Sequence, residues 1–456
     1  MLTFSLILLG KSLAFVSKAL NRGAGSTWPG HIALKAQKTF IQELLKNAPI
    51  KIILVVGTNG KTTTAKILCT ILEENDYKVF ENTSGANLLN GIASSLLLHT
   101  NAKGRLVDDF AIFEVDENNV SLVMEEVTPY AIIVLNLFRD QLDRYGELDS
   151  IAAKWKRSFD KLPSSTNLFL NADDPLIAYL GLSRSPKSHP ELHTVYFGLT
   201  SGIKQPLSHA ADTIYCPRCQ EKLVFNSLSY SHLGDWWCKH CGLKRPKLAI
   251  DDAYYPLEGI YNKYNTLAAV VTAQSVGLDK EQIKQALHTV TPAFGRQEKI
   301  SYKGKHIQIF LSKNPTGFNE TLRTISALRQ ASNQALNVLL ILNDQIPDGR
   351  DVSWIWDIDF EQYIERFEHI TISGERAYDM GLRLQYASNE KFLISNFKLN
   401  SKSPRSGRAK YYLEQDLKKA LDHALENTPI NETLYILPTY SAMLDIRKIL
   451  TGKKIL

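Results

Sequence analysis

Val55-Val56-Gly57-Thr58-Asn59-Gly60-Lys61-Thr62-Thr63-Thr64 is the stretch that decides the fold. The apolar run from Ile52 to Val56 predicts a buried strand, and the apolar residues after Lys61 recur at helical spacing. The two glycines between these segments permit a tight turn. The stretch therefore predicts a strand, a phosphate-binding loop and a helix in direct succession.

A loop of this kind binds a polyphosphate through its backbone N–H groups and the positive end of the following helix. The Lys61 ammonium can reach the terminal phosphates, and the Thr62 hydroxyl can ligate Mg²⁺. The spacing is G-x-x-G-K-T, two residues shorter than the general P-loop pattern. The alternative is a glycine turn before an amphipathic helix. The residues predicted to bind nucleotide here are Gly57, Thr58, Asn59, Gly60, Lys61, Thr62 and Thr63.

The composition is that of an ordinary globular protein with more than one domain. The chain has 456 residues, 44% hydrophobic and 22% charged, and a length of this order suggests two to four domains. Its net charge of +6 is modest and its basic residues are scattered, which argues against a nucleic-acid-binding tail. Four of the five cysteines form two C-x-x-C pairs, which favours a metal site in a reducing cytoplasm over disulfides.

The first twenty residues are apolar and are interrupted by Lys11 and Lys18. They predict an amphipathic helix, packed on the body of the protein or lying near a membrane surface, in preference to a spanning segment. A peripheral membrane contact stays open. A second helix is expected from His31 to Lys46.

Strands are expected at Tyr77–Phe80, Phe110–Val115 and Ala131–Leu135, alternating with helices. This order predicts an α/β fold with a doubly wound, mostly parallel sheet, in which ligands bind at the carboxyl ends of the strands. Glu114 ends one such strand, so it is the first choice for a magnesium ligand. The acidic loop 171–175, after another short strand, offers further carboxylates.

A zinc ribbon is expected as an insertion at about residues 212–246. Eighteen residues separate the two C-x-x-C pairs, and this fits the spacing of four-cysteine zinc sites. Four thiolates fill a tetrahedral Zn²⁺ site and leave no position for a substrate, so the predicted role is structural. The aromatic residues around the ribbon leave nucleic-acid binding as an alternative to packing. The predicted zinc ligands are Cys216, Cys219, Cys238 and Cys241.

The α/β pattern starts again near residue 298, which predicts a C-terminal α/β domain. Helices are expected at Thr266–Val276 and Lys280–Thr289 before this boundary. Beyond it, a strand at Val338–Leu342 leads into a loop, 343–357, that carries four aspartates and two tryptophans. A last strand, Leu434–Leu437, is followed by an expected loop, Thr439–Ala442. The predicted domains are therefore 1–48, 49–298 and 299–456.

Several motifs together resemble the Mur ligase family over about residues 50 to 300. They are Gly57-Thr58-Asn59-Gly60-Lys61-Thr62, Asn136 with Asp140 and Asp143, Asn171-Ala172-Asp173-Asp174, Asn262 with Asn265, and Gly295-Arg296. The four-cysteine insertion and the loop Asp348–Asp357 narrow the resemblance to the MurT-type synthetase subunits of lipid II isoglutaminyl synthase. With these features the resemblance covers nearly the whole chain.

This resemblance implies an ATP- and Mg²⁺-dependent carbon–nitrogen ligase. Such enzymes phosphorylate a carboxylate and let an amine attack the acyl phosphate. The implied product is D-isoglutamine, made by amidating the α-carboxyl of D-glutamate in the lipid II stem peptide. The implied partner is a GatD-type glutaminase, which supplies ammonia within a heterodimer. The implied location is the cytoplasm, with the inner face of the membrane left open.

The resemblance also implies a role for each matching residue. Lys61 and Thr62 would handle the phosphates and Mg²⁺, and Glu114 would bind a metal. Asn265 would lie on the adenine side and Arg296 would contact the nucleotide. Asp351 would reach into the glutaminase and complete its Cys–His pair, because a carboxylate there orients the histidine and stabilises its cation.

Three positions qualify the match. Gln141 stands where most Mur ligases have His, and Lys313-Asn314-Pro315 replaces a His-Asn-Pro turn. Both changes suit ammonia as the second substrate and speak against an amino-acid-adding muramyl-peptide or folylpolyglutamate ligase. Such a ligase is nevertheless kept as an alternative. A second alternative is a zinc-ribbon nucleotide-binding protein that acts on nucleic acid. Lys154 matches a lysine that is carbamylated in many Mur ligases, and an unmodified, exposed helix lysine is the alternative.

Overall fold

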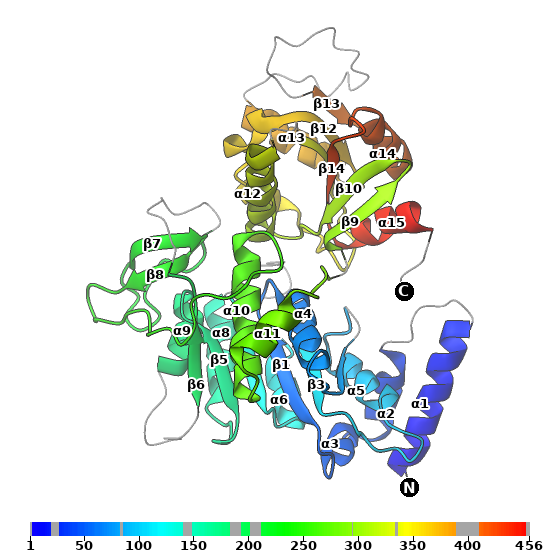
Figure 1. Ribbon diagram of the computed structural model, residues 1–456, viewed down its shortest axis with the longest axis vertical. Coiled ribbons are helices and arrows are strands. Elements are labelled where there is room, and N and C mark those ends of the chain that lie inside the picture. Colours follow the sequence, from blue (N-terminus) through cyan, green and yellow to red (C-terminus); the bar gives the residue numbers. More distant parts are fainter. Residues whose placement is uncertain are drawn as a thin grey trace.

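A computed structural model describes residues 2–19, 27–82, 85–139, 148–182, 193–200, 211–293, 295–332, 336–388 and 410–452. Two six-stranded sheets follow each other along the chain and lie at opposite ends of the long axis of the molecule (Figure 1). The second sheet starts with a strand at Arg296. The predicted domain limits near residues 48 and 298 stay predictions.

The apolar run before the phosphate loop lies in the middle of the first sheet. The strand order is β2-β3-β1-β4-β5-β6, and all neighbouring strands are parallel. Five of the six residues of β1 are buried, as expected for a strand covered on both faces. The strands are β1 Lys51–Val56, β2 Val79–Glu81, β3 Phe110–Val115, β4 Ala131–Val134, β5 Asn167–Asn171 and β6 Thr194–Phe197.

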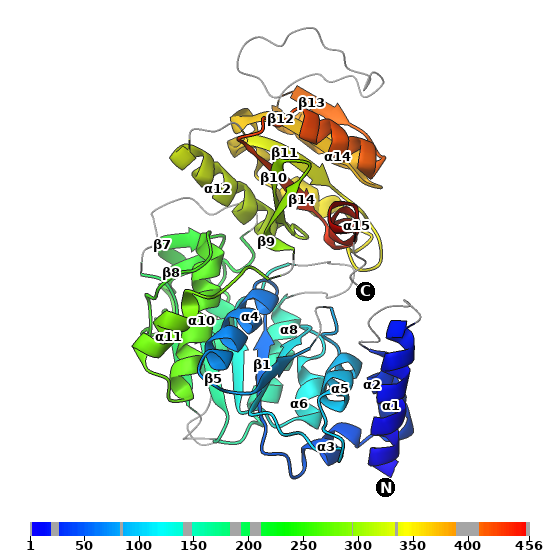
Figure 2. The same ribbon diagram turned by 45° about the vertical axis from the view of Figure 1, so that its right-hand side comes forward.

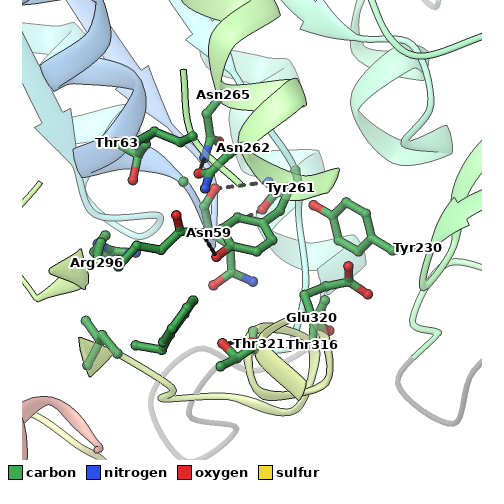
Figure 3. Close-up of a pocket in the computed structure, with 17 residues that line it drawn as sticks. Asn59, Thr63, Tyr230, Tyr261, Asn262, Asn265, Arg296, Thr316, Glu320 and Thr321 are labelled. Atoms are coloured by element: carbon green, nitrogen blue, oxygen red, sulfur yellow. Dashed lines mark hydrogen bonds between the residues drawn. The ribbon is translucent and has the colours of Figure 1, made fainter. Parts of the chain in front are cut away.

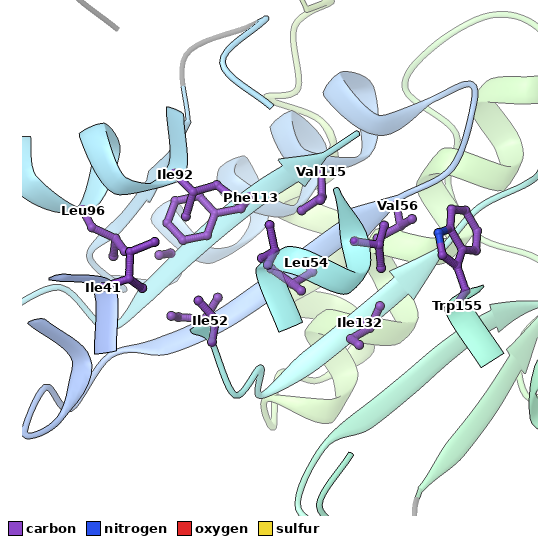
Figure 4. Packing of buried hydrophobic residues seen from close by; sticks show 14 of the residues in the cluster. Ile41, Ile52, Leu54, Val56, Ile92, Leu96, Phe113, Val115, Ile132 and Trp155 are labelled. Atoms are coloured by element: carbon purple, nitrogen blue, oxygen red, sulfur yellow. The ribbon is translucent and has the colours of Figure 1, made fainter. Parts of the chain in front are cut away.

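Two hydrophobic layers cover this sheet because successive side chains of a strand point to opposite faces. Leu54 and Val56 pack with the N-terminal helices on one face (Figure 4), whereas Ile53 and Val55 pack with α4, α10 and α11 on the other. On the first face lie α1 Leu2–Ala19, α2 Trp28–Ala36, α3 Phe40–Leu45, α5 Leu89–Leu98, α6 Val120–Glu126, α8 Leu148–Phe159 and α9 Pro175–Leu182. On the second lie α4 Lys61–Glu73, α10 Ile260–Ser275 and α11 Lys280–Leu287.

The second sheet has the order β13-β12-β11-β14-β10-β9 and is parallel except for β9, which is antiparallel to β10. Its strands are β9 Arg296–Tyr302, β10 Lys305–Phe310, β11 Leu336–Ile341, β12 Phe367–Ser373, β13 Lys410–Leu413 and β14 Thr433–Pro438. Its helices are α12 Pro315–Ser332, α13 Ala377–Ser388, α14 Leu417–Glu426 and α15 Tyr440–Thr451, with short 3₁₀ turns η1 Ser353–Asp357, η2 Phe360–Gln362 and η3 Ile364–Arg366.

A separate hairpin of β7 Val224–Tyr230 and β8 Leu233–Trp237 lies between β6 and α10 in the sequence. It docks on the first sheet at the end of β5. The Trp236 indole N–H donates to the Ala172 carbonyl at 3.0 Å, and Gly234 N donates to the Asp173 carbonyl at 3.1 Å. The hairpin is therefore fixed beside the edge where the strands end.

Two helix predictions and one loop prediction were wrong. The expected helix His31–Lys46 is two helices, because Gln37 is extended and ends α2. The helix expected from Thr266 starts six residues earlier, after Gly259, whose φ of +92° favours glycine. The expected loop 439–442 is the start of α15: Thr439 is its extended N-cap, a position where the short polar side chains typical of loops are also favoured.

The leading segment forms α1, as expected for a helix packed on the body. One side of this helix contacts α2 and α5 (Figure 2). Within the ranges that the structure describes, no helix combines the length and the apolar character needed to cross a bilayer.

Candidate active site

The phosphate loop 57–60 connects the buried end of β1 to the start of α4. Gly57 has a φ of +140° and Gly60 a φ of +93°, so both take conformations that favour glycine. A Cβ at Gly60 would lie only 2.1 Å from the Asn265 side-chain oxygen. Backbone conformation and close packing therefore both require glycine at this position.

Asn136, the second residue after β4, holds this loop in place. Its side chain accepts from Asn59 N at 2.9 Å and donates to the Asn59 carbonyl at 3.0 Å. Its own carbonyl accepts from Thr58 N at 3.1 Å. The loop is thus shaped before any ligand arrives, because β1 and β4 are parallel neighbours that end at the same edge.

Lys61 lies inside the loop at the start of α4. Its ammonium donates to the Gly57 carbonyl and lies 3.1 Å from the Glu117 carboxylate. Both side chains are largely buried. Sequence analysis did not identify Glu117, because an acid in the turn after β3 resembles an ordinary helix-capping residue.

Thr62 and Glu114 place two oxygens together at the end of β3. The Thr62 hydroxyl donates to Glu114 Oε2 at 2.8 Å. Burial raises the pKa of the Glu114 carboxyl, while Arg296, Thr62 and Lys61 act against this shift. Hydroxyl and carboxylate oxygens are the donors that Mg²⁺ prefers, so this pair fits the predicted ion. Glu81, at the end of β2, has a pKa raised to about 7 by burial and by the charge of Glu114.

A pocket opens between the loop and the second sheet (Figure 3). The predicted nucleotide residues Asn59, Gly60, Thr63, Asn265 and Arg296 line one part of it. α12 contributes a further part, and Asn314, just before α12, donates to Asn59 Oδ1 at 3.0 Å. The two halves of the chain therefore meet at the phosphate loop.

Several further lining residues were not predicted from the sequence, and Tyr230, Gln297 and Glu320 are three of them. Gln297 donates to the Tyr261 hydroxyl at 2.8 Å, and Tyr230 reaches the pocket from the end of β7. Glu320 is fully buried on α12, and its Oε2 has no hydrogen-bond partner among the described residues. These residues come from distant segments, and nothing in their local pattern distinguishes them from core or surface positions.

The carboxylates after β5 do not face the phosphate loop. Asp173 accepts from the Tyr264 hydroxyl at 2.6 Å and pairs with Arg245, also at 2.6 Å. Asp174 accepts from the backbone N–H groups of Leu176 and Leu137. Both are engaged in fixing the edge of the sheet, so the acidic loop 171–175 offers no free metal ligands.

Of the remaining predicted positions, Asp140, Gln141 and Asp143 lie outside the described residues. Lys154 is exposed on α8. This position agrees with the alternative of an unmodified, exposed helix lysine. Carbamylation of Lys154 stays a prediction.

The four predicted zinc ligands converge. The sulfur atoms of Cys216, Cys219, Cys238 and Cys241 all lie within 4.8 Å of one another. Cys216 and Cys241 are 3.6 Å apart, and Cys219 and Cys238 are 3.5 Å apart. Four sulfurs about 2.3 Å from a tetrahedral Zn²⁺ would be about 3.8 Å apart, so the donor set fits zinc.

Asp351 lies in the loop between β11 and η1, and it lines a pocket together with Asn314, the residue that donates to Asn59 of the phosphate loop. It is exposed, and its carboxylate accepts from Ser353 N at 2.8 Å at the start of η1. This hydrogen bond lowers the pKa of the Asp351 carboxyl. Asp351 shares a second, polar pocket with Arg139, Lys313 and Asp357.

The sequence matches two family models. Residues 55–273 match the Mur ligase middle domain and residues 311–443 match the MurT ligase C-terminal domain. The MurT subunit of lipid II isoglutaminyl synthase (glutamine-hydrolyzing) from Streptococcus pneumoniae is 33% identical, over 98% of this chain and 97% of that protein. The chain belongs to the MurT family. A Staphylococcus aureus MurT subunit is 32% identical to this MurT-family chain, over 85% of it and 88% of the relative.

Solved structures support the fold assignment for this MurT-family chain. A pseudomurein peptide ligase type C from Methanothermus fervidus has a TM-score of 0.63 at 22% identity, covering 90% of this chain and 81% of that one. Folylpolyglutamate synthase from Mycobacterium tuberculosis has a TM-score of 0.58 at 14% identity, covering 98% and 99%. These structures confirm the predicted Mur ligase-like α/β fold, and the family models and MurT relatives confirm the assignment to the ligases.

Glu320 makes the stability of this MurT-family chain depend on pH. Burial raises the pKa of its carboxyl to about 7, from an ordinary value near 4.5. The folded state therefore holds this proton more tightly than the unfolded chain does. The protonated Glu320 carboxyl contributes fully to the free energy of unfolding at low pH, and this contribution is lost as the pH rises towards 7. We expect Glu320→Gln to raise the free energy of unfolding at pH 7.5 by about 1–3 kcal/mol, with little change at pH 5.

Urea unfolding without nucleotide at these two pH values measures the effect. Part of the pH dependence stays in the variant, because the pKa of Glu81 is raised as well. Glu368→Gln, at an exposed position on β12, serves as the matched control. An equal change at both pH values would contradict the assignment to Glu320.

Cys216→Ser should lower both zinc content and stability. Cys216 is fully buried, and a closed four-thiolate site contributes its binding free energy to folding. We expect loss of the bound zinc, measured by elemental analysis, and a fall in the thermal midpoint of several degrees or more. Cys69→Ser is the control, because Cys69 is buried outside the cluster. Full zinc content in the Cys216 variant would contradict the site.

Proposed function

We propose that this chain is the synthetase subunit of a two-subunit lipid II isoglutaminyl synthase. It converts the D-glutamate α-carboxyl of the lipid II stem peptide to the amide of D-isoglutamine, with ATP and Mg²⁺. The observation that carries the proposal is the similarity to MurT subunits along almost the whole chain. The phosphate loop supports it, because it lies in a pocket shared with the C-terminal half.

The reaction follows two balanced steps. A carboxylate oxygen of the substrate attacks the γ-phosphorus of ATP, so that ADP leaves and an acyl phosphate forms. The nitrogen of ammonia then attacks the acyl carbon, phosphate leaves, and the nitrogen loses a proton. Both steps place negative charge near the phosphates, so fixed N–H groups and cations at this position lower the barrier.

The chain's own residues have distinct roles in this scheme. The backbone of Gly57–Gly60 and the Lys61 ammonium bind and orient the phosphates. Thr62 and Glu114 supply oxygens for Mg²⁺, which would neutralise phosphate charge when bound. Arg296, which lies near Glu114, contacts the nucleotide, and Asn265 lies on its adenine side.

The partner is a GatD-type glutaminase that releases ammonia from glutamine. Asp351 supports this assignment because it is an exposed carboxylate with a lowered pKa, and is therefore charged at neutral pH. Trp356, in the same loop, packs edge-on against Tyr386 of α13 with ring centroids 5.4 Å apart. An exposed apolar patch of this kind is typical of a protein interface. Its exposed members are Ile346, Trp356, Tyr378, Leu382 and Tyr386.

Two alternatives are less well supported. Lys313 precedes Asn314 in the pocket region, where an amino-acid-adding ligase would have His, and this favours ammonia as the second substrate. Of the ribbon aromatics, Tyr230 and Trp236 are buried, which favours packing for these two, whereas Tyr215 and Trp237 are exposed. We place the reaction in the cytoplasm, where ATP, the precursor and reduced thiols occur together.

The test is to purify the chain with its glutaminase and supply lipid II, ATP and glutamine. Amidated lipid II should form with one ADP per amide, and free ammonia should replace glutamine. If ATP is not consumed with lipid II and ammonia present, the proposal fails. Transfer of an amino acid in place of ammonia would support the amino-acid-adding alternative.

A further inference from the structure

α1 has an apolar surface on both of its sides. Leu6 and Ile7 face inward and are buried, and Gly10 lies so close to α5 that a Cβ there would meet Leu97 at 2.6 Å. The opposite side is exposed and largely apolar, although it also carries the exposed serines Ser5 and Ser12. This α1 outer face consists of Leu2, Phe4, Leu8, Leu9, Phe15 and Val16, and Phe15 is 75% exposed.

Trp28, at the start of α2, is a further exposed apolar side chain of the N-terminal helices. The Thr3 hydroxyl donates to Gln37 at 3.1 Å, so the end of α2 lies beside the start of α1 and the two helices run antiparallel. The start of α2 then lies toward the other end of α1, as in Figure 2. Trp28, at this start, is 70% exposed, with its ring edge-on to His31. A tryptophan at the border of an apolar surface is typical of contact with a lipid headgroup region.

Positive charge lies at one end of this apolar surface, beside the start of α1. The first 42 residues contain five Lys and Arg residues but neither Asp nor Glu, although the net charge of the whole chain is only +6. Lys35 and Lys38 are exposed at the end of α2, beside the start of α1. Lys103 and Arg105 are exposed on either side of Gly104, which packs against Phe4. The nearby acids are Glu43, Asp108 and Asp109.

We propose that the α1 outer face docks on an anionic phospholipid bilayer. Exposed Leu, Phe and Val side chains would enter the boundary between headgroups and acyl chains, and the lysines and arginine beside the start of α1 would contact lipid phosphates. Because its inner side packs on α2 and α5, α1 lies in the plane of the surface. The inference rests on the proposed function in one respect: a lipid-linked substrate gives the docking a purpose.

Vesicle binding tests the proposal directly. The chain, in complex with its partner subunit, is sedimented with vesicles of phosphatidylglycerol and phosphatidylcholine, and with vesicles of phosphatidylcholine alone. We expect binding to the anionic vesicles that weakens with salt. The double variant Leu8→Ser, Phe15→Ser should reduce the partition coefficient about tenfold or more, because two large apolar contacts are lost.

The control is Ile430→Ser, which changes a side chain that is 68% exposed in the other half of the chain and should leave vesicle binding unchanged. Equal binding by wild type and the double variant, or no binding by wild type, would overturn the proposal. The proposal would also be overturned if analytical ultracentrifugation showed that the double variant no longer binds a second copy of the chain or the partner subunit. The vesicles contain no lipid II, so the absence of vesicle binding would not contradict the proposed amidation reaction. Likewise, a negative amidation assay would not contradict vesicle binding.

Discussion

Lys61→Ala is expected to abolish ATP-dependent amidation by the complex while the partner continues to hydrolyse glutamine. The Lys61 ammonium is the cation held at the start of α4, within the loop proposed to bind the phosphates. In phosphoryl transfer, catalysis comes mainly from positioning and from stabilising the charge on the transferred group. We therefore expect kcat for amidation to fall about a thousandfold or more, close to the limit of detection.

Formation of ADP and amidated lipid II measures this prediction, with glutamate release as the second readout. Removing Lys61 leaves the Glu117 carboxylate buried without its partner, so the thermal midpoint of the variant must be checked. Lys61→Arg keeps a charge next to Glu117 and separates loss of folding from loss of catalysis. Lys284→Ala, at an exposed position on α11, is the matched control. Normal amidation by Lys61→Ala would remove the loop from the mechanism.

Asp351→Asn should have the opposite effect. Asparagine can keep the hydrogen bond from Ser353 N that shapes the start of η1, so the loop should retain its structure. It loses only the negative charge proposed to stabilise the histidine of the glutaminase. We expect glutamate release by the complex to fall about a hundredfold or more, with nucleotide binding unchanged.

Ammonia distinguishes this effect from damage to the synthetase. The Asp351→Asn complex should still amidate lipid II when free ammonia is supplied, whereas the Lys61→Ala complex should not. Asp344→Asn changes a half-buried aspartate of the same loop, which pairs with Arg376, and should leave both activities intact. Loss of both activities to the same extent in both variants would contradict the proposed division of labour.

Local sequence was sufficient where a short segment determines its own structure. The apolar run of β1, the two glycines and the helix after Lys61 are adjacent in the chain, so their pattern predicted the strand, the turn and the helix that the structure shows. The same holds for the cysteine pairs, whose spacing predicted their convergence. Glu114 could be chosen because parallel strands end at one edge of their sheet, and β3 is in fact the direct neighbour of β1.

Positions determined by tertiary packing could not be found in this way. Asn265 lies under Gly60 across about two hundred residues of sequence, and only the family resemblance indicated it. Glu320 has the sequence environment of an ordinary helix residue, yet α12 buries it against the pocket. The acids after β5 were ambiguous for a related reason: their partners Arg245 and Tyr264 come from much later segments.

Tyr230 connects the four-cysteine segment with the pocket beside the phosphate loop, although the two belong to separate sequence motifs. β7 follows the first cysteine pair, and its last residue forms part of the pocket wall beside the phosphate loop. The hairpin between the two cysteine pairs thus supplies part of the pocket wall. A change that unfolds this hairpin is therefore expected to remove one wall of the pocket and to weaken binding there.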